Sequence, residues 1–376
     1  MKIAFVCDTI QSELGGGVTA ARHVVNRLRK DHEVTVIGAD AYGDPRLTLC
    51  GFQLPLRAMR EMQFVMARPD RKALAKALAT VDVVHLQLPF WLSFAALGEA
   101  KKAARPVVAA FHVQPENAFM NVGLRSELLY RLSYRFSIER FYNRADAVVC
   151  PSRFAERKLR EHGLSVPTFV ISNGVPSDVG GDRGAREPEL RQKFVVLTVG
   201  RLAAEKRQDL VIRAVAGSRF RDRIYLVVAG GGPREAELRR LMQKSGVEGE
   251  LGFLPRERLL NLLGTSDLLI HASEVELEGI AVLEAMQMGL PVLVAEGPET
   301  AAAELALDDS FRFAGREPRS LTQKLDALLA APDKRAVAGA LYREAAQRLT
   351  VEASVSSLVQ VYRQVAGMRV EPEPVH

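Results

Sequence analysis

The sequence SEVELEGIAVLEAMQMGLPV, residues 273–292, is the most informative segment of this chain. An apolar run at residues 268–270 precedes it and predicts a buried strand, which leads into an acidic loop. Gly279 then opens a helical pattern of apolar residues that closes at Gly289, before a second apolar strand at 292–295. This order of strand, loop, helix and strand is typical of a parallel α/β sheet.

The loop that leads onto Gly279 predicts an anion-binding site. The first backbone N–H groups of a helix have no internal partner and lie at the positive end of its dipole, and a glycine lets a phosphate approach closely. Glu276 and Glu284 flank this position, with seven residues between them. Because ionised carboxylates only accept hydrogen bonds, we expect them to bind hydroxyl groups, such as those of a ribose or a hexose.

Together, Glu276, Gly279, Glu284 and the string EAMQMGLPV resemble the signature of the retaining glycosyltransferases of family 4. The resemblance implies the GT-B fold, in which two doubly wound Rossmann-like parallel-sheet domains face a central cleft. It also implies a nucleotide diphosphate sugar as donor, linked to UDP or GDP. No Asp-x-Asp pair is present in the chain, so we expect neither a bridging metal nor another cofactor. An acidic loop can also be plain solvated surface, and the other motifs along the chain decide against that alternative.

Length and composition favour a two-domain globular protein. The chain has 376 residues, 48% of them hydrophobic and only 6% aromatic, which is typical of an α/β protein. The sequence has no apolar run of about 18 to 20 residues and no signal-peptide pattern, so we expect a cytoplasmic location, with peripheral binding to the inner face of the membrane as a further expectation. The three widely spaced cysteines are expected to be small buried hydrophobic residues in a reducing compartment.

We expect an acceptor-side domain at residues 1–175, a Gly- and Pro-rich linker at 176–189 and a nucleotide-sugar domain at 190–350. By resemblance, a last helix at about 351–368 crosses back to the first domain. Residues 1–175 carry 24 Lys and Arg against 16 Asp and Glu, whereas the remainder carries 27 against 29. The basic excess therefore belongs to the first half.

Both halves alternate apolar strands with helical patterns, which predicts two doubly wound parallel sheets. In the first half, a long helix is expected at about 126–144. Beyond residue 295 we expect a helix at 299–307, a short strand at 311–313, a helix at 321–331 and a final helix at about 351–366.

The glycine run after the first strand allows two functions. Gly15, Gly17 and Ala20 satisfy the dinucleotide fingerprint, and Asp40 lies where a ribose-binding acid would stand in a nicotinamide-dependent oxidoreductase. The fingerprint should follow its strand at once, however, and seven residues intervene here. In the resembled family this loop faces the donor, which implies that Gly16 and Gly17 contact the substrate.

His112 follows the apolar strand PVVAAF, at the end of the sheet where α/β proteins bind ligands. An imidazole there can donate to a phosphate or a sugar hydroxyl, although a structural histidine bonded to a loop carbonyl is the common alternative. The resembled family often keeps a histidine after this strand, near the transferred sugar. For His85 the sequence offers only a structural role.

Arg201 and Lys206 follow the strand FVVLTV and match the family's Gly-Arg-Leu segment with its later lysine. Two fixed cations there would stabilise the charge that develops on a departing diphosphate. By the same resemblance, the backbone near Leu254 meets the nucleobase. His271 and Glu278 depart from the pattern, since proline is common at the first position and an aromatic residue at the second.

Two stretches, residues 57–76 and 119–144, interleave arginines with large apolar side chains. Such faces suit an anionic bilayer, and lipid-modifying members of the resembled family dock their first domain in this way. The alternative is a core-facing helix with a solvated basic face. No nucleic-acid-binding signature accompanies these arginines, so no nucleic-acid partner is expected.

The sequence therefore predicts a retaining hexosyltransferase that acts on a lipid or polysaccharide acceptor. The residues expected to carry catalysis or to bind the donor are His112, Arg201, Lys206, Glu276, Glu284, Gly279, Ile280, Leu254, Gly16 and Gly17. The implied route is same-face attack, in which the departing phosphate oxygen takes the acceptor proton. A nicotinamide oxidoreductase and a noncatalytic membrane-surface protein are the competing functions.

Overall fold

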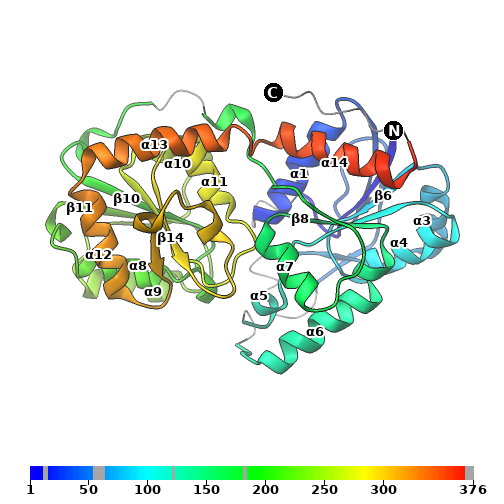
Figure 1. Ribbon diagram of the computed structural model, residues 1–376, viewed down its shortest axis with the longest axis horizontal. Coiled ribbons are helices and arrows are strands. Elements are labelled where there is room, and N and C mark those ends of the chain that lie inside the picture. Colours follow the sequence, from blue (N-terminus) through cyan, green and yellow to red (C-terminus); the bar gives the residue numbers. More distant parts are fainter. Residues whose placement is uncertain (12–15, 54–63, 121–122, 181–183, 369–376) are drawn as a thin grey trace. The chain divides into compact units, whose positions relative to one another are not determined.

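The computed structural model describes residues 1–11, 16–53, 64–120, 123–180 and 184–368 (Figure 1). The chain divides into two compact units. Unit 1 comprises Met1–Gly174 together with Val351–His376, and unit 2 comprises Val175–Thr350.

Unit 1 is built on a seven-stranded sheet in which every neighbouring pair is parallel, in the order β3-β2-β1-β6-β7-β8-β9. Its strands are β1 (Lys2–Val6), β2 (Glu33–Gly38), β3 (Arg46–Thr48), β6 (Val83–Leu86), β7 (Val107–Ala110), β8 (Ala147–Cys150) and β9 (Thr168–Val170). A separate antiparallel pair joins β4 (Gly51–Phe52) to β5 (Met66–Ala67). The strands β6, β7 and β8 are buried throughout, so β7 and β8 are continuous apolar runs rather than alternating ones, and β6 is apolar except for the buried His85.

The helices of unit 1 pack on this sheet, and α14 packs beside α1. They are α1 (Gly16–Leu28), α3 (Arg71–Leu78), α4 (Trp91–Lys102), α5 (Pro115–Met120), α6 (Glu127–Arg140), α7 (Arg153–Glu161) and α14 (Val351–Val365), with the short 3-10 helix η1 (Tyr142–Arg144). Tyr362 of α14 is fully buried in the same apolar core as Phe5 and Val25. The last described helix of the chain is thus an integral part of unit 1.

Unit 2 is built on a six-stranded parallel sheet in the order β12-β11-β10-β13-β14-β15. Its strands are β10 (Phe194–Val199), β11 (Ile224–Ala229), β12 (Gly249–Gly252), β13 (Leu268–His271), β14 (Val292–Glu296) and β15 (Arg312–Ala314). The chain moves outward from β10 through β11 to β12, then returns to the other side of β10 with β13. This is the strand order of the dinucleotide-binding fold, and its switch point lies between β10 and β13.

Helices cover both faces of the unit 2 sheet (Figure 1). The neighbours α8 (Gln208–Ala216), α9 (Glu235–Lys244) and α12 (Pro318–Leu329) pack together, and so do α10 (Arg256–Thr265), α11 (Ile280–Gln287) and α13 (Pro332–Ala346). Short 3-10 helices complete the unit: η2 (Ser177–Gly180), η3 (Pro188–Leu190), η4 (Ala204–Lys206), η5 (Arg221–Arg223), η6 (Ala302–Leu305) and η7 (Asp309–Phe311). One continuous apolar core, which includes Leu197, Leu269 and Leu283, lies between the layers.

Part of the expected linker is bonded to unit 2. The Arg186 guanidinium donates to the Thr265 carbonyl and pairs with Asp267 at 3.0 Å. Glu187 pairs with Arg258 at 2.9 Å, and Val179 is buried in the unit 2 core. These contacts fix the described residues on either side of 181–183 to the second sheet.

Three local expectations were wrong. The helix at 299–307 is reduced to η6, because Glu276 pairs its backbone with this segment: its N–H donates to the Glu299 carbonyl and its own carbonyl accepts from Ala301. The helix expected at 126–144 ends at Arg140. Cys50 is exposed, although Cys7 and Cys150 are buried, and all three are free thiols.

The helix α13 was not expected from the sequence. Pro332 stands in its first turn, where the missing N–H costs nothing. Gly339 lies within α13, and a Cβ there would come within 2.4 Å of the Gly289 carbonyl oxygen. The glycine therefore permits the close contact between α13 and the end of α11, rather than interrupting the helix.

Candidate active site

The predicted donor residues of unit 2 gather at the carboxyl ends of β10 and β13, on both sides of the switch point. Gly200 and Arg201 follow β10, and His271 ends β13. A Cβ on Gly200 would lie 3.9 Å from Cδ of Lys206, so the lysine stem passes over this glycine. Parallel α/β sheets bind their ligands at this edge.

Lys206 and Glu276 form an ion pair in this edge, with 2.5 Å between Nζ and Oε2. The lysine side chain is 20% exposed and the glutamate side chain 18%, so water screens the pair only partly. His271 Nε2 lies 3.3 Å from the same Oε2. The Glu276 carboxylate of the acidic loop therefore contacts both Lys206 and His271 at the end of β13.

Burial on its own would raise the pKa of Glu276, but the charge of Lys206 and the contact with His271 outweigh it. The pKa of Glu276 is therefore held well below its usual range. The carboxylate is ionised at neutral pH and can accept a hydrogen bond from a hydroxyl group.

Gly279 stands immediately before α11 with φ 94°, in the left-handed region that favours glycine. The N–H groups of Val282 and Leu283 donate to its carbonyl. Within the described residues, the N–H of Ile280 at the helix start makes no hydrogen bond. The helix start predicted at Gly279 and Ile280 is confirmed, and it presents a backbone donor beside Glu276.

Arg201 is held by a residue that sequence reasoning missed. Its Nη2 contacts Oε1 of Glu205, whose side chain is fully buried. The Glu205 carbonyl accepts the N–H of Glu274 at 2.7 Å, so the same residue also fixes the acidic loop. The only available signal was a carboxylate one residue before a predicted catalytic lysine.

Glu284 on α11 pairs with Arg256 on α10, at 2.7 Å between Oε1 and Nη2. Burial raises the pKa of Glu284, and Arg256 offsets part of this effect. The pair joins the predicted ribose-binding residue to the segment after β12, where Leu254 packs partly buried on the core and Phe253 is 68% exposed. Arg256 itself was not singled out from the sequence, since an arginine at a helix start has no distinguishing pattern.

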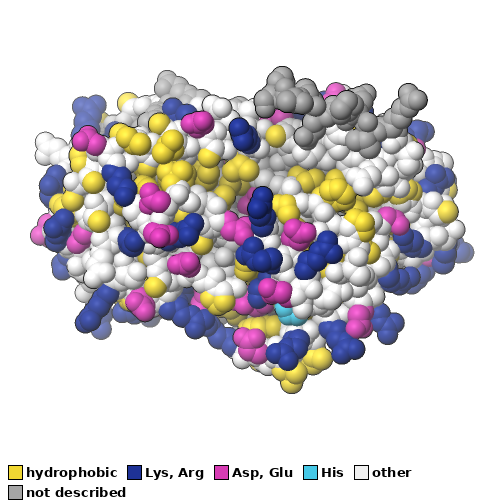
Figure 2. Space-filling model, viewed as in Figure 1, with side chains coloured by type: hydrophobic (Ala, Val, Ile, Leu, Met, Phe, Trp, Pro, Cys, Tyr) yellow, Lys and Arg dark blue, Asp and Glu magenta, His cyan; other side chains and the backbone are white. Residues whose placement is uncertain are grey.

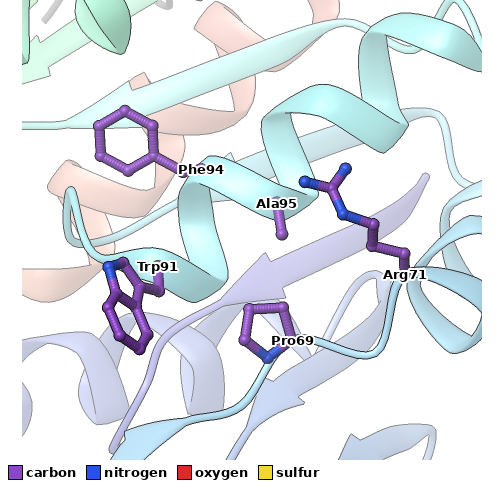
Figure 3. Close-up of a pocket in the computed structure, with 5 residues that line it drawn as sticks. All are labelled: Pro69, Arg71, Trp91, Phe94 and Ala95. Atoms are coloured by element: carbon purple, nitrogen blue, oxygen red, sulfur yellow. The ribbon is translucent and has the colours of Figure 1, made fainter.

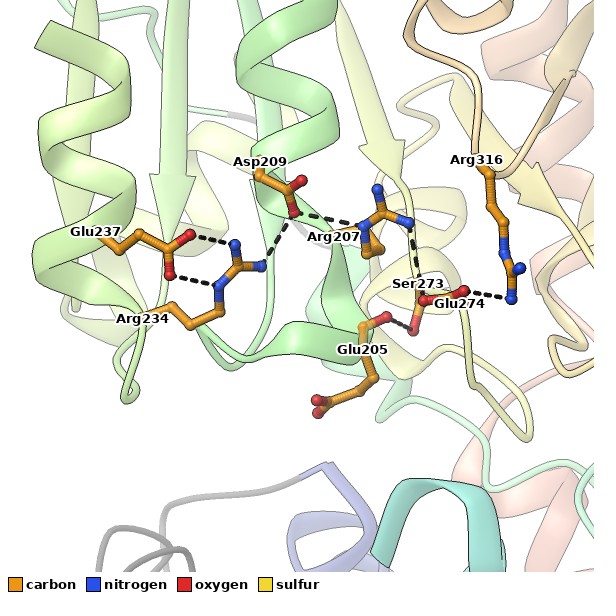
Figure 4. A network of polar contacts seen from close by, with 8 residues as sticks. All are labelled: Glu205, Arg207, Asp209, Arg234, Glu237, Ser273, Glu274 and Arg316. Atoms are coloured by element: carbon orange, nitrogen blue, oxygen red, sulfur yellow. Dashed lines mark hydrogen bonds and ion pairs between the residues drawn. The ribbon is translucent and has the colours of Figure 1, made fainter. Parts of the chain in front are cut away.

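A chain of ion pairs crosses the same edge from α9 to the segment before α12 (Figure 4). Its members are Glu237, Arg234, Asp209, Arg207, Glu274 and Arg316, with spacings of 2.5 to 3.8 Å. Arg207 adopts φ 51°, a left-handed conformation that is unfavourable for a side chain with a Cβ. Through Arg207 and Arg316, this network anchors Glu274, two residues before Glu276.

In unit 1, His112 follows β7 and is half-buried. Burial, with a smaller effect of His85, lowers the pKa of His112 to about 3, so the imidazole is neutral at physiological pH. His85 is buried, and it contacts Oε1 of Gln87 at 2.9 Å and the Tyr362 hydroxyl at 2.8 Å. These bonds agree with the structural role expected for His85.

Gly16 and Gly17 form the exposed first turn of α1. Gly15, which the dinucleotide fingerprint requires, lies outside the described residues. The Asp40 carboxylate accepts from Thr9 Oγ1 and from the N–H groups of Ile10 and Gln11, at 2.7 to 2.9 Å. Asp40 therefore fixes the loop after β1, and its carboxylate is poorly placed to bind the hydroxyl groups of a ribose.

A shallow hollow of about 540 Å³ opens on unit 1 between α3 and α4 (Figure 3). Its lining residues are Pro69, Arg71, Trp91, Phe94 and Ala95. The Phe94 ring lies 6.0 Å from the ring of Phe136 on α6, so the hollow adjoins that helix. Among the residues that the structure covers, no group of three or more His, Cys, Asp or Glu side chains is placed to hold a metal ion.

Two parallel sheets of the dinucleotide-binding type, with a cationic and acidic edge on the second, define a glycosyltransferase of the GT-B class. Known proteins agree with this assignment. Residues 14–179 match the family model Glycosyltransferase Family 4, and residues 184–344 match Glycosyl transferases group 1. The chain belongs to glycosyltransferase family 4.

Curated relatives extend over most of the chain. The alpha-monoglucosyldiacylglycerol synthase of Streptococcus pneumoniae is 25% identical over 79% of this chain and 72% of its own length. A GDP-mannose-dependent alpha-mannosyltransferase of Mycolicibacterium smegmatis is 26% identical over 81% and 82%, respectively. A D-inositol 3-phosphate glycosyltransferase of Geodermatophilus obscurus is 30% identical over 76% and 67%.

Solved structures share the fold. The crystal structure of Anabaena HepE in complex with UDP and glucose aligns with a TM-score of 0.74 at 19% identity, covering 97% of this chain and 100% of that one. The sucrose-phosphate synthase of Thermosynechococcus elongatus aligns with a TM-score of 0.73 at 18% identity, covering 98% and 99%. The predicted GT-B fold is confirmed.

Proposed function

We propose that this glycosyltransferase moves a hexose, with retention of configuration, from a nucleoside diphosphate sugar to a lipid or polysaccharide acceptor at an anionic membrane surface. The observation that carries the proposal is the cluster of Lys206, Glu276 and the α11 start at the switch point of unit 2. It combines a cation, a hydroxyl acceptor and a free backbone donor in one place. Names of relatives support the substrates, since one makes a glucosylated diacylglycerol and another uses GDP-mannose.

In this proposal the diphosphate lies between Arg201, Lys206 and the N–H of Ile280. The Lys206 ammonium has three donors, so it can bind a phosphate oxygen and still keep Glu276. Fixed cations at this point stabilise the negative charge that grows on the leaving group. Because they supply that charge themselves, we propose that the reaction proceeds without a bridging metal.

The acidic residues recognise the hydroxyl groups of the donor. Glu276 accepts from the sugar, and Glu284 accepts from the ribose after exchanging part of its contact with the exposed Arg256. The backbone near Leu254 meets the nucleobase. His112, Gly16 and Gly17 of unit 1 contact the donor in the same proposal, with His112 as a neutral hydrogen-bonding group near the transferred sugar.

The proposed reaction is same-face substitution. The bond between the anomeric carbon and the phosphate oxygen breaks, and a bond from the acceptor oxygen forms on the same face of the sugar. The acceptor proton passes to the departing phosphate oxygen, so a glycoside and a nucleoside diphosphate leave. No protein nucleophile is needed, and exclusion of water limits hydrolysis of the donor.

The helix α6 is the evidence for membrane binding. Tyr134 and Ile138 of this helix face the core, as expected if α6 is only a core-facing helix with a solvated basic face. The opposite side, however, exposes Leu128, Leu132 and Phe136 at four-residue intervals, with 63%, 54% and 59% of each residue accessible. We call these three residues the α6 apolar face.

Exposed arginines accompany this face. They are Arg125, Arg131, Arg135 and Arg140. Hydrophobic and basic side chains gather together at the lower edge of Figure 2, where Figure 1 places α6. Through Phe136 and Phe94 the apolar surface reaches the hollow beside the exposed Trp91. Apolar side chains ringed by cations suit the interface of an anionic bilayer.

In the part of the chain that the structure describes, no helix is both long and apolar enough to cross a membrane.

A transfer assay tests the proposed function. The full chain is incubated with radiolabelled UDP-glucose or GDP-mannose, anionic vesicles containing diacylglycerol, and a polysaccharide primer. We expect release of the nucleoside diphosphate and label in either the chloroform extract or the polymer, an α-linkage by NMR, and unchanged activity in EDTA. Lys206→Ala should lower the rate at least a hundredfold, which corresponds to about 3 kcal/mol. A chain that transfers no sugar from either donor, or a Lys206→Ala variant with normal activity, contradicts the proposal.

A further inference from the structure

The proposed function gives no role to His271, the last residue of β13. This histidine is 4% exposed, and it ends the strand that borders the switch point beside β10. Its neighbours Leu269 and Ile270 are apolar and fully buried, as expected for a central parallel strand. A polar ring at this strand end therefore requires an explanation.

The ring faces the predicted donor site. Nε2 lies 3.3 Å from Oε2 of Glu276, and 3.6 Å from the position that a Cβ on Gly279 would take. The imidazole thus packs between the acidic loop and the start of α11. Within the described residues, Nε2 is buried and has no hydrogen bond of good geometry. Polar contacts in active sites are often long in the free enzyme and shorten when substrate binds.

Both contacts of the Glu276 carboxylate fall on one oxygen. Lys206 Nζ and His271 Nε2 both approach Oε2, and neither of these two interactions is made to Oε1. The backbone of Glu276 is fixed as well, through its hydrogen bonds with Glu299 and Ala301. With one oxygen and the backbone held, the direction of Oε1 is determined.

We propose that His271 is a positioning residue for Glu276 and that it thereby determines how tightly the enzyme recognises a hydroxyl of the donor sugar. The inference rests on the proposed function. When Lys206 Nζ shares its donors between Oε2 and a phosphate oxygen, Nε2–H of His271 helps to hold Oε2 in place, and Oε1 stays directed at the sugar. His271 touches neither the reacting atoms nor the diphosphate in this scheme, and it acts only through the carboxylate.

A double-mutant cycle tests this role. His271→Leu removes the donor at similar size, and His271→Gln keeps an N–H at the position of Nε2. Each is made in the wild-type chain and in Glu276→Ala, and kcat and KM for the donor sugar are measured together with the affinity for the free nucleoside diphosphate. A hydrogen bond to a charged group predicts a loss of roughly tenfold in kcat/KM for His271→Leu, with most of it restored in His271→Gln.

The cycle separates positioning from a structural role. We expect no additional loss in kcat/KM from His271→Leu in the Glu276→Ala background. In the background that keeps Glu276, each His271 variant should bind the nucleoside diphosphate within about twofold of wild type, because His271 does not contact the diphosphate. An equal loss in both backgrounds, or a His271→Gln variant as slow as His271→Leu, overturns the inference while the proposed function stands. A Glu276→Ala variant with normal kcat/KM overturns both the inference and the sugar contact in the proposed function.

Discussion

Lys206 and Glu276 form an ion pair in which both side chains are largely removed from water, so loss of the lysine leaves an uncompensated carboxylate. Breaking a buried pair in this way costs roughly 3 kcal/mol. We predict that Lys206→Ala lowers the free energy of unfolding by about this amount at pH 7, as measured by denaturant titration. Lys206→Arg keeps the charge and serves as the matched control.

The pH dependence of this loss has a definite sign. The pKa of Glu276 is lowered in the folded chain, so its stabilising contribution is present above its ordinary value of 4.5 and is lost as the pH falls below it. The difference in stability between wild type and Lys206→Ala should therefore narrow as the solution becomes acidic. A difference in stability that stays constant from pH 5 to pH 2 contradicts this assignment of the pair.

Asp8 is a buried carboxyl group with the opposite behaviour. Its Oδ1 accepts the N–H of Ala67 at 3.0 Å, and burial raises its pKa from 3.8 to about 6. Because the pKa of Asp8 is 3.8 in the unfolded chain and about 6 in the folded one, wild type loses stability as the pH rises from about 4 through about 6, by about 3 kcal/mol in all. We predict that Asp8→Asn is more stable than wild type at pH 7.5 and close to it at pH 3.5 in thermal melts. A difference in stability that is as large at pH 3.5 as at pH 7.5 would exclude ionisation of Asp8 as its cause.

Two substitutions of Arg207 test whether its backbone conformation is strained, because both of them remove the same side-chain contacts. At φ 51° a residue with a Cβ is disfavoured, whereas glycine is not. Arg207→Gly and Arg207→Ala both lose the contacts with Asp209 and Glu274, so they differ only in the backbone term. We predict that the glycine variant is more stable than the alanine variant by about 1 kcal/mol, measured by urea unfolding. Equal stabilities would show that the left-handed conformation is not retained in solution.

At the residue scale, the sequence predicted the groups that belong to a local motif. Glu276, Gly279 and Lys206 could be found because spacing along the chain places them at a strand end or a helix start. Glu205 and Arg256 could not be found, since they pair with residues of other segments, and for His271 the sequence showed an unusual residue but not its contact with Glu276. The roles of the predicted residues in transfer stay predictions until the variants are measured.

At the scale of single elements, α6 carries the clearest surface prediction. Leu132→Glu places a negative charge in the α6 apolar face, so we predict a loss of at least tenfold in binding to phosphatidylglycerol vesicles, measured by cosedimentation. Val337→Glu on α13, where the native valine is 61% exposed, is the matched control and should bind as wild type does. If the two variants weaken binding equally, or neither does, the α6 apolar face is not a membrane contact.

Elements were predictable where their pattern was continuous. The buried strands β10, β11 and β13 were found because each of them consists mostly of apolar residues. The helix α13 was missed because Pro332 and Gly339 look like interruptions, although one begins the helix and the other allows close packing on Gly289. For residues 299–307 the error was the reverse, since a helix was predicted and only a short 3-10 helix is present. Backbone pairing of this segment with the loop at Glu276 competes with its helix propensity.

At the scale of the whole molecule, the fold was predictable from alternating strands and helices in both halves, and the switch point followed from the position of the signature after β13. The order of the strands in each sheet could not be predicted from the sequence, since no local pattern shows which distant strands pair with each other. The same order explains why residues from η4, β13 and α11 meet, although Lys206 and Ile280 are far apart along the chain.

In the proposed enzyme, Arg201, Lys206 and the start of α11 bind the diphosphate of the donor. Isothermal titration of the full chain with UDP and GDP measures this binding, with Lys206→Ala and Arg201→Ala beside wild type and Lys193→Ala as the control. Lys193 is a lysine of unit 2 that pairs with Glu248, away from the switch-point residues. We predict that one of the two nucleotides binds wild type and the control with the same affinity, and binds Lys206→Ala and Arg201→Ala at least tenfold more weakly. Unchanged affinity in Lys206→Ala and Arg201→Ala would contradict it.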